Sequence, residues 1–199
     1  MNASFMQRHP GLRDVIGLAV FVICVAIGTL FINTFIFRTF SVVGPSMETT
    51  MQTGDRLIVN RMPVTLSQLQ NEQYIPQRGE IIVFKNPNYS VDGSNEYIVK
   101  RVIAFPEERV VVQNGEITVY NSSRPAGFNP DDSNGGEPGS PTSGEVDTVV
   151  PEGTLFVAGD HREGNYSLDS RSGLGTIPYH DVIGPVGVRI WPIADIRTF

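Results

Sequence analysis

The feature that most constrains this chain is an uncharged apolar run from Val15 to Phe37, VIGLAVFVICVAIGTLFINTFIF. A helix rises about 1.5 Å per residue, so a run of this length crosses the roughly 30 Å hydrocarbon core of a bilayer. The run predicts a transmembrane helix over 15–37, preceded by a short segment, 1–14. The alternatives are a buried core helix or a cleaved signal peptide, whose apolar part is shorter and ends at small residues. Because Arg38-Thr39-Phe40 follows, a retained anchor is favoured.

Basic residues around the run indicate its orientation. Arg8 and Arg13 precede it and Arg38 follows it. Because positive charge favours the cytoplasmic side, we expect a single-pass protein of the plasma membrane with a cytoplasmic N-terminus. The lipid bilayer is then one partner, and 38–199 form a domain on the outer face.

Beyond Phe37 the sequence reads as short strands separated by Gly, Pro and Asn. We therefore expect a mainly β fold, an all-β domain behind one N-terminal helix. The predicted strands are 40–43, 56–61, 80–85, 96–105, 109–113, 116–120, 154–158 and 181–191, the last broken at Gly184-Pro185. A helical turn is expected only at 66–73.

Residues 121–147 are rich in Ser, Pro, Gly, Asn and Asp, with five acids against Arg124. Such a segment buries little apolar surface, so we expect a flexible, exposed acidic loop between two strands. The net charge of −6 gives no basic surface and argues against nucleic acid as a partner. A single cysteine, Cys24, excludes a disulfide within the chain. The oligomeric state is not predictable.

Ser46 follows Gly44-Pro45 between the apolar run and the strand at 56–61. A serine hydroxyl is a weak nucleophile unless a base takes its proton. Among the histidines, His9 precedes the span and His180 lies in a polar turn. His161 follows Asp160, but adjacent Asp and His side chains rarely point together, so a histidine base is disfavoured.

Lys100 is a sharper candidate for the base. In EYIVKRVIAF both faces of the strand are apolar, so one cation lies against hydrophobic neighbours. Burial lowers the pKa of a lysine toward working pH, whereas arginine keeps its proton. Strand evidence alone still favours an edge-strand lysine whose stem covers apolar surface.

A third polar stretch, GDHREGNYSLDSR at 159–171, follows the strand at 154–158. Its Ser167 hydroxyl is suited to orienting a buried lysine. Asp169 and Arg171 are suited to pairing with each other and holding the loop. Taken singly, this motif is only a polar turn.

Together the three stretches resemble bacterial type I signal peptidases, Ser-Lys endopeptidases that remove signal peptides from exported preproteins. GPSMETTMQTGDRLIVNR is similar to the family's S-M-x-P-T-L followed by G-D, YIVKRVIAFPEE to its K-R-x-x-G-L-P-G-D, and GDHREGNYSLDSR to its G-D-N-R-x-x-S-x-D-S-R. RGEIIVF is similar to its R-G-D-I-V-V-F. The resemblance extends from the anchor to about Pro192 and is closest to the Gram-positive type with one N-terminal anchor.

The resemblance implies Ser46 as nucleophile, Lys100 as general base and Ser167 as the residue orienting the lysine. It implies structural roles for Asp169 and Arg171. Gly44 stands where other members offer a hydroxyl to the oxyanion, leaving the Ser46 backbone N–H as donor. No metal or cofactor is implied, since no His/Cys/carboxylate cluster has ligand spacing.

Four departures from the family pattern concern efficiency and substrate range more than reaction type. They are Thr49 for proline, Ala104 for glycine, Glu107-Glu108 for G-D, and His161 for asparagine in a Gly159–Ser167 stretch about two residues longer than usual.

Two alternatives stay open. One is another Ser-Lys peptidase, such as the self-cleaving repressor type, although a membrane span stands where that type has its DNA-binding module. The other is a non-catalytic membrane-anchored β-module, a degenerate peptidase. The distance between the Ser46 hydroxyl and the Lys100 amine separates the second alternative from an enzyme.

Overall fold

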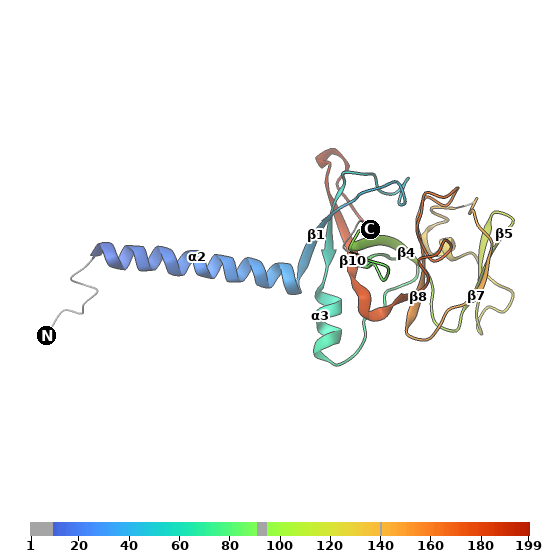
Figure 1. Cartoon of the computed structure of the whole chain (residues 1–199), viewed down its shortest axis with the longest axis horizontal. Coiled ribbons are helices and arrows are strands. Elements are labelled where there is room, and N and C mark those ends of the chain that lie inside the picture. The colour runs from blue at the N-terminus through green and yellow to red at the C-terminus, as the bar shows by residue number, and fades with distance from the viewer. Residues whose placement is uncertain (1–9, 91–94, 140) are drawn as a thin grey trace.

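A computed structural model describes residues 10–90, 95–139 and 141–199. A long helix, α2 (Pro10–Phe35), projects from a β-rich domain that holds the rest of the described chain (Figure 1). Residues 11–35 are apolar enough to cross a membrane. The prediction of a mainly β chain with one N-terminal apolar helix is confirmed. Most of the predicted segment 1–14, including Arg8, lies outside the described residues.

The helix differs in its bounds from the predicted run of 15–37. It ends at Phe35, and strand β1 (Phe37–Ser41) begins two residues later. Phe37 belongs to β1 because it pairs with Asn60 of β2 (Arg56–Asn60), at the end of a continuous antiparallel register. Apolarity alone did not separate the last residues of the span from the first residue of an amphipathic strand.

Most of the other strands fall close to their predicted bounds, since each is a short β-branched run closed by turn residues. The strands that were predicted are β3 (Ile81–Lys85), β4 (Tyr97–Ala104), β5 (Arg109–Gln113), β6 (Glu116–Tyr120), β8 (Thr154–Ala158) and β10 (Val182–Trp191). Three short strands were not predicted: β7 (Val146–Val149), β9 (Ile177–Pro178) and β11 (Arg197–Thr198). Strand β10 continues through Gly184-Pro185 with a register shift instead of breaking there.

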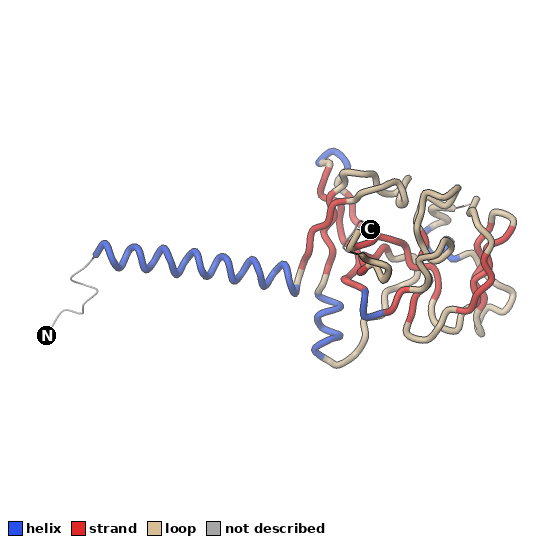
Figure 2. Tube along the Cα trace, viewed as in Figure 1, coloured by secondary structure: helices blue, strands red, loops and turns tan. Residues whose placement is uncertain are grey.

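The strands form two sheets, and loops join them over much of the surface (Figure 2). The large sheet has the order β1-β2-β10-β3-β4-β8-β9, with β11 on β10, and the small sheet has the order β6-β5-β7. Strand β4 therefore lies inside the large sheet, between β3 and β8. The large sheet curves enough for the Phe40 ring of β1 to meet the Tyr97 ring of β4, with centroids 5.2 Å apart.

Three apolar clusters fix this arrangement. One packs β2 and β3 against Met47 and Met51 of the segment after β1. A second joins β3, β4, β8 and β9, and the third joins the end of β4 to the small sheet. Because Met47 and Met51 are fully buried, the turn that carries Ser46 is anchored to the core directly after the serine.

Two elements differ from the predictions. The helical turn predicted at 66–73 is observed as helix α3 (Met62–Leu69), which begins and ends earlier in the chain. Pro63 suits the first turn of this helix, because the backbone N–H groups of a first turn have no partner within the helix. The predicted acidic loop, 121–147, is not simply exposed. It contains a 3-10 helix at Pro130–Asn134, in which Asp131 is buried, and its last residues belong to β7.

Candidate active site

Ser46 and Lys100, far apart in the sequence, meet in the structure. The Lys100 Nζ lies 2.6 Å from the Ser46 Oγ and donates to the Val99 carbonyl at 2.9 Å. Lys100 is 2% exposed and comes from the central strand β4, so the edge-strand interpretation of this lysine is wrong. The separation is within the reach required between a nucleophile and its base.

Burial sets the proton affinity of the lysine. Removal from water disfavours the ammonium and lowers the pKa of Lys100 from 10.5 to about 8, although the charges of Asp169 and Asp160 oppose the shift. A substantial fraction of the amine is therefore neutral near pH 8. Arginine at this position would stay charged at any such pH.

The turn around Ser46 has a defined backbone. Gly44 has φ +94°, a conformation that L side chains rarely adopt, and its N–H donates to Thr53 Oγ1 at 3.0 Å. The Ser46 carbonyl accepts from the His161 N–H at 3.1 Å. Within the described ranges, the Ser46 N–H has no hydrogen-bond acceptor. It is thus free to bind an oxyanion.

Gly159 is required where the loop after β8 passes Ser46. A Cβ on this residue would lie 2.2 Å from Ser167 Oγ and 2.3 Å from the Ser46 carbonyl oxygen. Real Cβ atoms do not approach so closely, so any side chain here would push the two site loops apart. The glycine of the GDHR motif is explained by this close approach.

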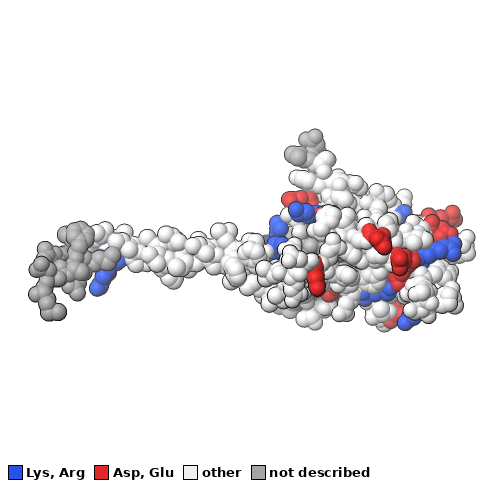
Figure 3. Space-filling view, turned by 90° about the horizontal axis from the view of Figure 1, so that it is seen from below, with Lys and Arg blue, Asp and Glu red and all other residues white. Residues whose placement is uncertain are grey.

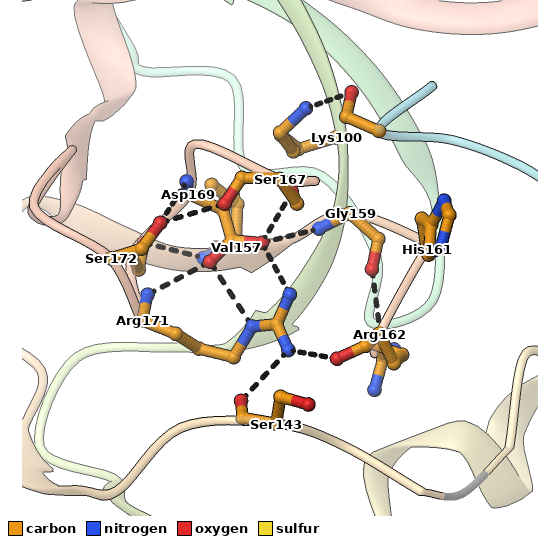
Figure 4. A network of polar contacts seen from close by, with 12 residues as sticks. Lys100, Ser143, Val157, Gly159, His161, Arg162, Ser167, Asp169, Arg171 and Ser172 are labelled. Carbon is orange, nitrogen blue, oxygen red and sulfur yellow. Dashed lines mark hydrogen bonds and ion pairs between the residues drawn. The ribbon is translucent and has the colours of Figure 1, made fainter. Parts of the chain in front are cut away.

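The carboxylate of Asp169 holds together the loop at 159–171 (Figure 4). It accepts from the Gly159 N–H at 2.9 Å, the Ser167 hydroxyl at 2.6 Å and the Arg171 guanidinium at 2.8 Å. Burial by itself would raise the pKa of Asp169, but Arg171 and these donors outweigh it and hold the pKa below its ordinary value. The expected pairing of Asp169 with Arg171 is present.

Ser167 is buried beside the lysine, but its hydroxyl is directed to Asp169. Among the hydrogen bonds of the described residues, none joins Ser167 to Lys100, so its predicted role in orienting the lysine stays a prediction. Two further ion pairs flank the site. Asp160 pairs with Arg101, the residue after Lys100, at 2.5 Å, and Arg162 pairs with Asp131 at 2.7 Å, all four side chains being buried.

The link between Arg162 and Asp131 was not anticipated from the sequence. Asp131 lies in the Ser/Pro/Gly-rich loop, where one acid among five carries no distinguishing signal. In the structure both of its oxygens bind Arg162, whose Nε also donates to the Gly159 carbonyl at 2.8 Å. The acidic loop therefore supports the backbone beside Ser46.

His161 contacts the nucleophile turn without reaching the hydroxyl. Its Nδ1 lies 3.2 Å from the Pro45 carbonyl oxygen, and its ring stacks on Tyr166 with centroids 4.5 Å apart. His9 lies outside the described residues. The Nε2 of His180 lies 3.7 Å from Oδ1 of its neighbour Asp181.

A groove of about 540 Å³ opens beside Ser46 and Lys100. Its walls are the end of β1 with the residues leading to Ser46, the first half of β4, and the exposed side chains of Tyr166 and Leu168. Strand β1 is the edge of the large sheet, so a peptide can add to it as a further strand.

Comparison with known proteins places this geometry in a family. Residues 12–191 match the family described as signal peptidase, peptidase S26. The chain belongs to this family. A signal peptidase I of Bacillus amyloliquefaciens is 32% identical over 180 residues, which cover 88% of this chain and 84% of the relative. A probable signal peptidase I-2 of Synechocystis is 32% identical over 168 residues, covering 83% and 68%.

A solved signal peptidase I structure from Enterococcus faecalis is 24% identical, with a TM-score of 0.41, covering 56% of this chain and 96% of that one. Family membership rests on the sequence matches. The four positions at which the sequence departs from the family pattern can now be located in the structure. Thr49 and His161 line a smaller cavity of about 250 Å³, Ala104 is buried, and Glu108 binds Arg78 at 2.7 Å.

Proposed function

We propose that this protein is a membrane-bound serine endopeptidase that removes signal peptides from exported preproteins, with Ser46 as nucleophile and Lys100 as general base. The observation that carries the proposal is the 2.6 Å approach of a buried lysine amine to a serine hydroxyl beside a groove. Membership in the signal peptidase family supports the substrate class.

The first half of the reaction forms an acyl-enzyme. The neutral amine of Lys100 takes the Ser46 proton as Oγ attacks the carbonyl carbon of the scissile peptide bond. The Ser46 N–H stabilises the resulting oxyanion. The carbon–nitrogen bond then breaks, the Lys100 ammonium returns its proton to the leaving amine, and the signal peptide remains as an ester on Ser46.

The second half releases the signal peptide. Lys100, neutral again, takes a proton from a water molecule, whose oxygen attacks the ester carbonyl. The ester bond to Ser46 breaks and Lys100 gives the proton back to Oγ. Asp169, Arg171 and Ser167 serve as positioning residues, because they hold Gly159 and the loop next to the lysine.

The groove favours an extended peptide with small residues near the cut. A peptide added to the free edge of β1 directs alternate side chains to the same side. Phe40, Val83 and Ile98 are among the apolar residues that line the groove. We therefore expect the first and third residues before the cleaved bond to face these apolar walls.

Location follows from the anchor. The candidate span at 11–35, uncharged between Asp14 and the domain (Figure 3), supports a position of the peptidase domain at a membrane surface. With Arg8 and Arg13 on the cytoplasmic side, the domain that follows the span lies on the outer face of the plasma membrane. Exported preproteins emerge on that face.

The test is cleavage of a purified preprotein by the detergent-solubilised chain, with Ser46→Ala as the matched control. We expect one cut after the signal peptide with the unaltered chain and none with Ser46→Ala. Equal cleavage by both would refute the proposal, and absence of cleavage by both would favour a binding module.

A further inference from the structure

Helix α3 presents an apolar stripe to its surroundings. Met62, Leu66 and Leu69 are 45%, 51% and 76% exposed, respectively. At 3.6 residues per turn these three positions lie on one side of the helix, opposite the buried Val64. The helix contains no charged residue. The stripe is therefore an exposed apolar surface, whereas the exposed face of a helix in water is normally polar.

Hydrogen bonds attach α3 to the end of the anchor. The Thr65 hydroxyl donates to the Phe35 carbonyl at 2.9 Å, and the Arg61 N–H donates to the Ile36 carbonyl at 2.8 Å. Figure 1 shows α3 running across the direction of α2, at the side of the domain that faces the anchor. The apolar stripe thus continues directly from the end of the candidate span.

Two arginines, Arg38 and Arg61, lie where the end of α2 meets the start of α3. The Arg38 guanidinium lies over the rings of Phe40 and Tyr97, 5.1 and 4.6 Å from their centroids. Arg61 is partly exposed, and its buried Nε has no hydrogen-bond partner. No carboxylate of the described residues forms an ion pair with either arginine. Basic residues beside an apolar stripe are typical of helices that lie in a membrane interface.

We propose that α3 is a second membrane contact: it lies flat on the bilayer, with Met62, Leu66 and Leu69 at the boundary of headgroups and acyl chains and Arg38 and Arg61 toward lipid phosphates. The proposal rests on the membrane anchoring by α2 proposed above. Since Arg38 touches Phe40 and Tyr97, which line the groove, this contact sets the position of the groove relative to the membrane.

A second copy of the chain fits this surface less well. A stable pair of proteins buries about 1,200 Å² or more, far beyond what three side chains of one short helix offer. Two copies meeting here would also bring four arginines together. The bilayer satisfies both the apolar stripe and the positive charges.

The test uses the whole chain in vesicles of phosphatidylcholine and phosphatidylglycerol, with one environment-sensitive fluorophore on a single cysteine. Three labelled proteins are compared: the natural Cys24, which reports the anchor, and Leu69→Cys and Gln68→Cys in a Cys24→Ser background. Gln68 is exposed but lies off the stripe. We expect blue-shifted emission and quenching by spin-labelled lipid at Cys24 and Leu69→Cys, and water-like emission at Gln68→Cys.

The outcomes separate this proposal from the anchor itself. Lipid quenching at Cys24 with water-like emission at Leu69→Cys would overturn the α3 contact and leave the anchor standing. Water-like emission at all three positions would overturn both. Shielding at Leu69→Cys that depends on protein concentration and not on lipid quencher would assign the stripe to a second copy and overturn the proposal.

A functional arm uses Leu66→Gln/Leu69→Gln, which leaves the groove residues unchanged. We expect normal cleavage of a soluble peptide in detergent and a several-fold loss on a preprotein embedded in vesicles. Equal activity of this variant and the unaltered chain on the embedded preprotein would contradict a role for α3 in placing the groove. Loss on both substrates equally would also contradict it.

Discussion

Replacing Lys100 by methionine tests the buried lysine through stability and activity together. Methionine keeps most of the length of the side chain but carries no charge. The pKa of Lys100 is lowered from 10.5 to about 8, chiefly by burial. At about 1.4 kcal/mol per pKa unit, the charged lysine costs the folded state roughly 3 kcal/mol. We expect Lys100→Met to be inactive and yet more stable at pH 7, by about 1–3 kcal/mol after loss of the lysine's hydrogen bonds.

The stability difference between Lys100→Met and the natural protein should depend on pH in one direction. Below pH 8 both the folded and the unfolded chain hold the proton, so the full cost is present. Between about pH 8 and 10.5 only the unfolded chain keeps it, so the natural protein gains stability as pH rises and the advantage of Lys100→Met shrinks. Urea unfolding of the detergent-solubilised chain, followed by the fluorescence of Trp191, measures both proteins. An advantage that does not change between pH 7 and 10 would refute the reasoning.

Activity should follow the same titration. The rate should rise with pH and reach half its maximum near pH 8, because only the neutral amine accepts the Ser46 proton. Lys100→Arg keeps the charge but cannot act as a base, so it should be as inactive as Lys100→Ala. Ser46→Ala and Lys100→Ala together should cost little more than either alone, since the pair acts as a unit. Substantial activity in Lys100→Arg would remove the lysine from the mechanism.

Four further predictions concern the surroundings of the pair, the substrate and the orientation in the membrane. His161→Ala should keep substantial peptidase activity, because His161 Nδ1 contacts the Pro45 carbonyl and not the Ser46 hydroxyl; complete loss with the fold intact would favour a histidine base. Asp131→Asn should lower the free energy of unfolding by about 3 kcal/mol, because Arg162 keeps its charge in a buried position without its partner; an unchanged urea midpoint would show that the pair is not coupled to the fold. A large aromatic residue at the first or third position before the cut should abolish processing of a preprotein, and equal cleavage of such substrates would indicate a peptidase of another kind. Finally, protease added to intact spheroplasts should cut the acidic loop at its exposed residues 135–137, and protection of this site in spheroplasts but not after their lysis would contradict the proposed orientation.

Several features of this protein follow from local sequence alone. The apolar run indicates a membrane-crossing helix because length and hydropathy are properties of a single segment. Strands such as 109–113, 116–120 and 154–158 were predictable to the residue, since short β-branched runs closed by Gly, Pro or Asn permit few other structures. The pairing of Ser46 with Lys100 was predicted from the resemblance of their motifs to those of signal peptidases, and the structure brings the two side chains together.

The tertiary structure decided what depends on contacts between distant segments. The strand pattern alone favoured an edge-strand position for Lys100, because β3 and β8 on either side of β4, and the Ser46 turn and the Asp169 loop beside the side chain, are all distant in the sequence. The partner of Ser167 is Asp169 because the loop folds back on itself around that carboxylate. Asp131 binds Arg162 across a long sequence separation, and no local pattern distinguishes one acid in a polar loop from its neighbours. Local composition sets which segments form helices and strands, whereas the proton affinity of a side chain is set by the segments that exclude water from it.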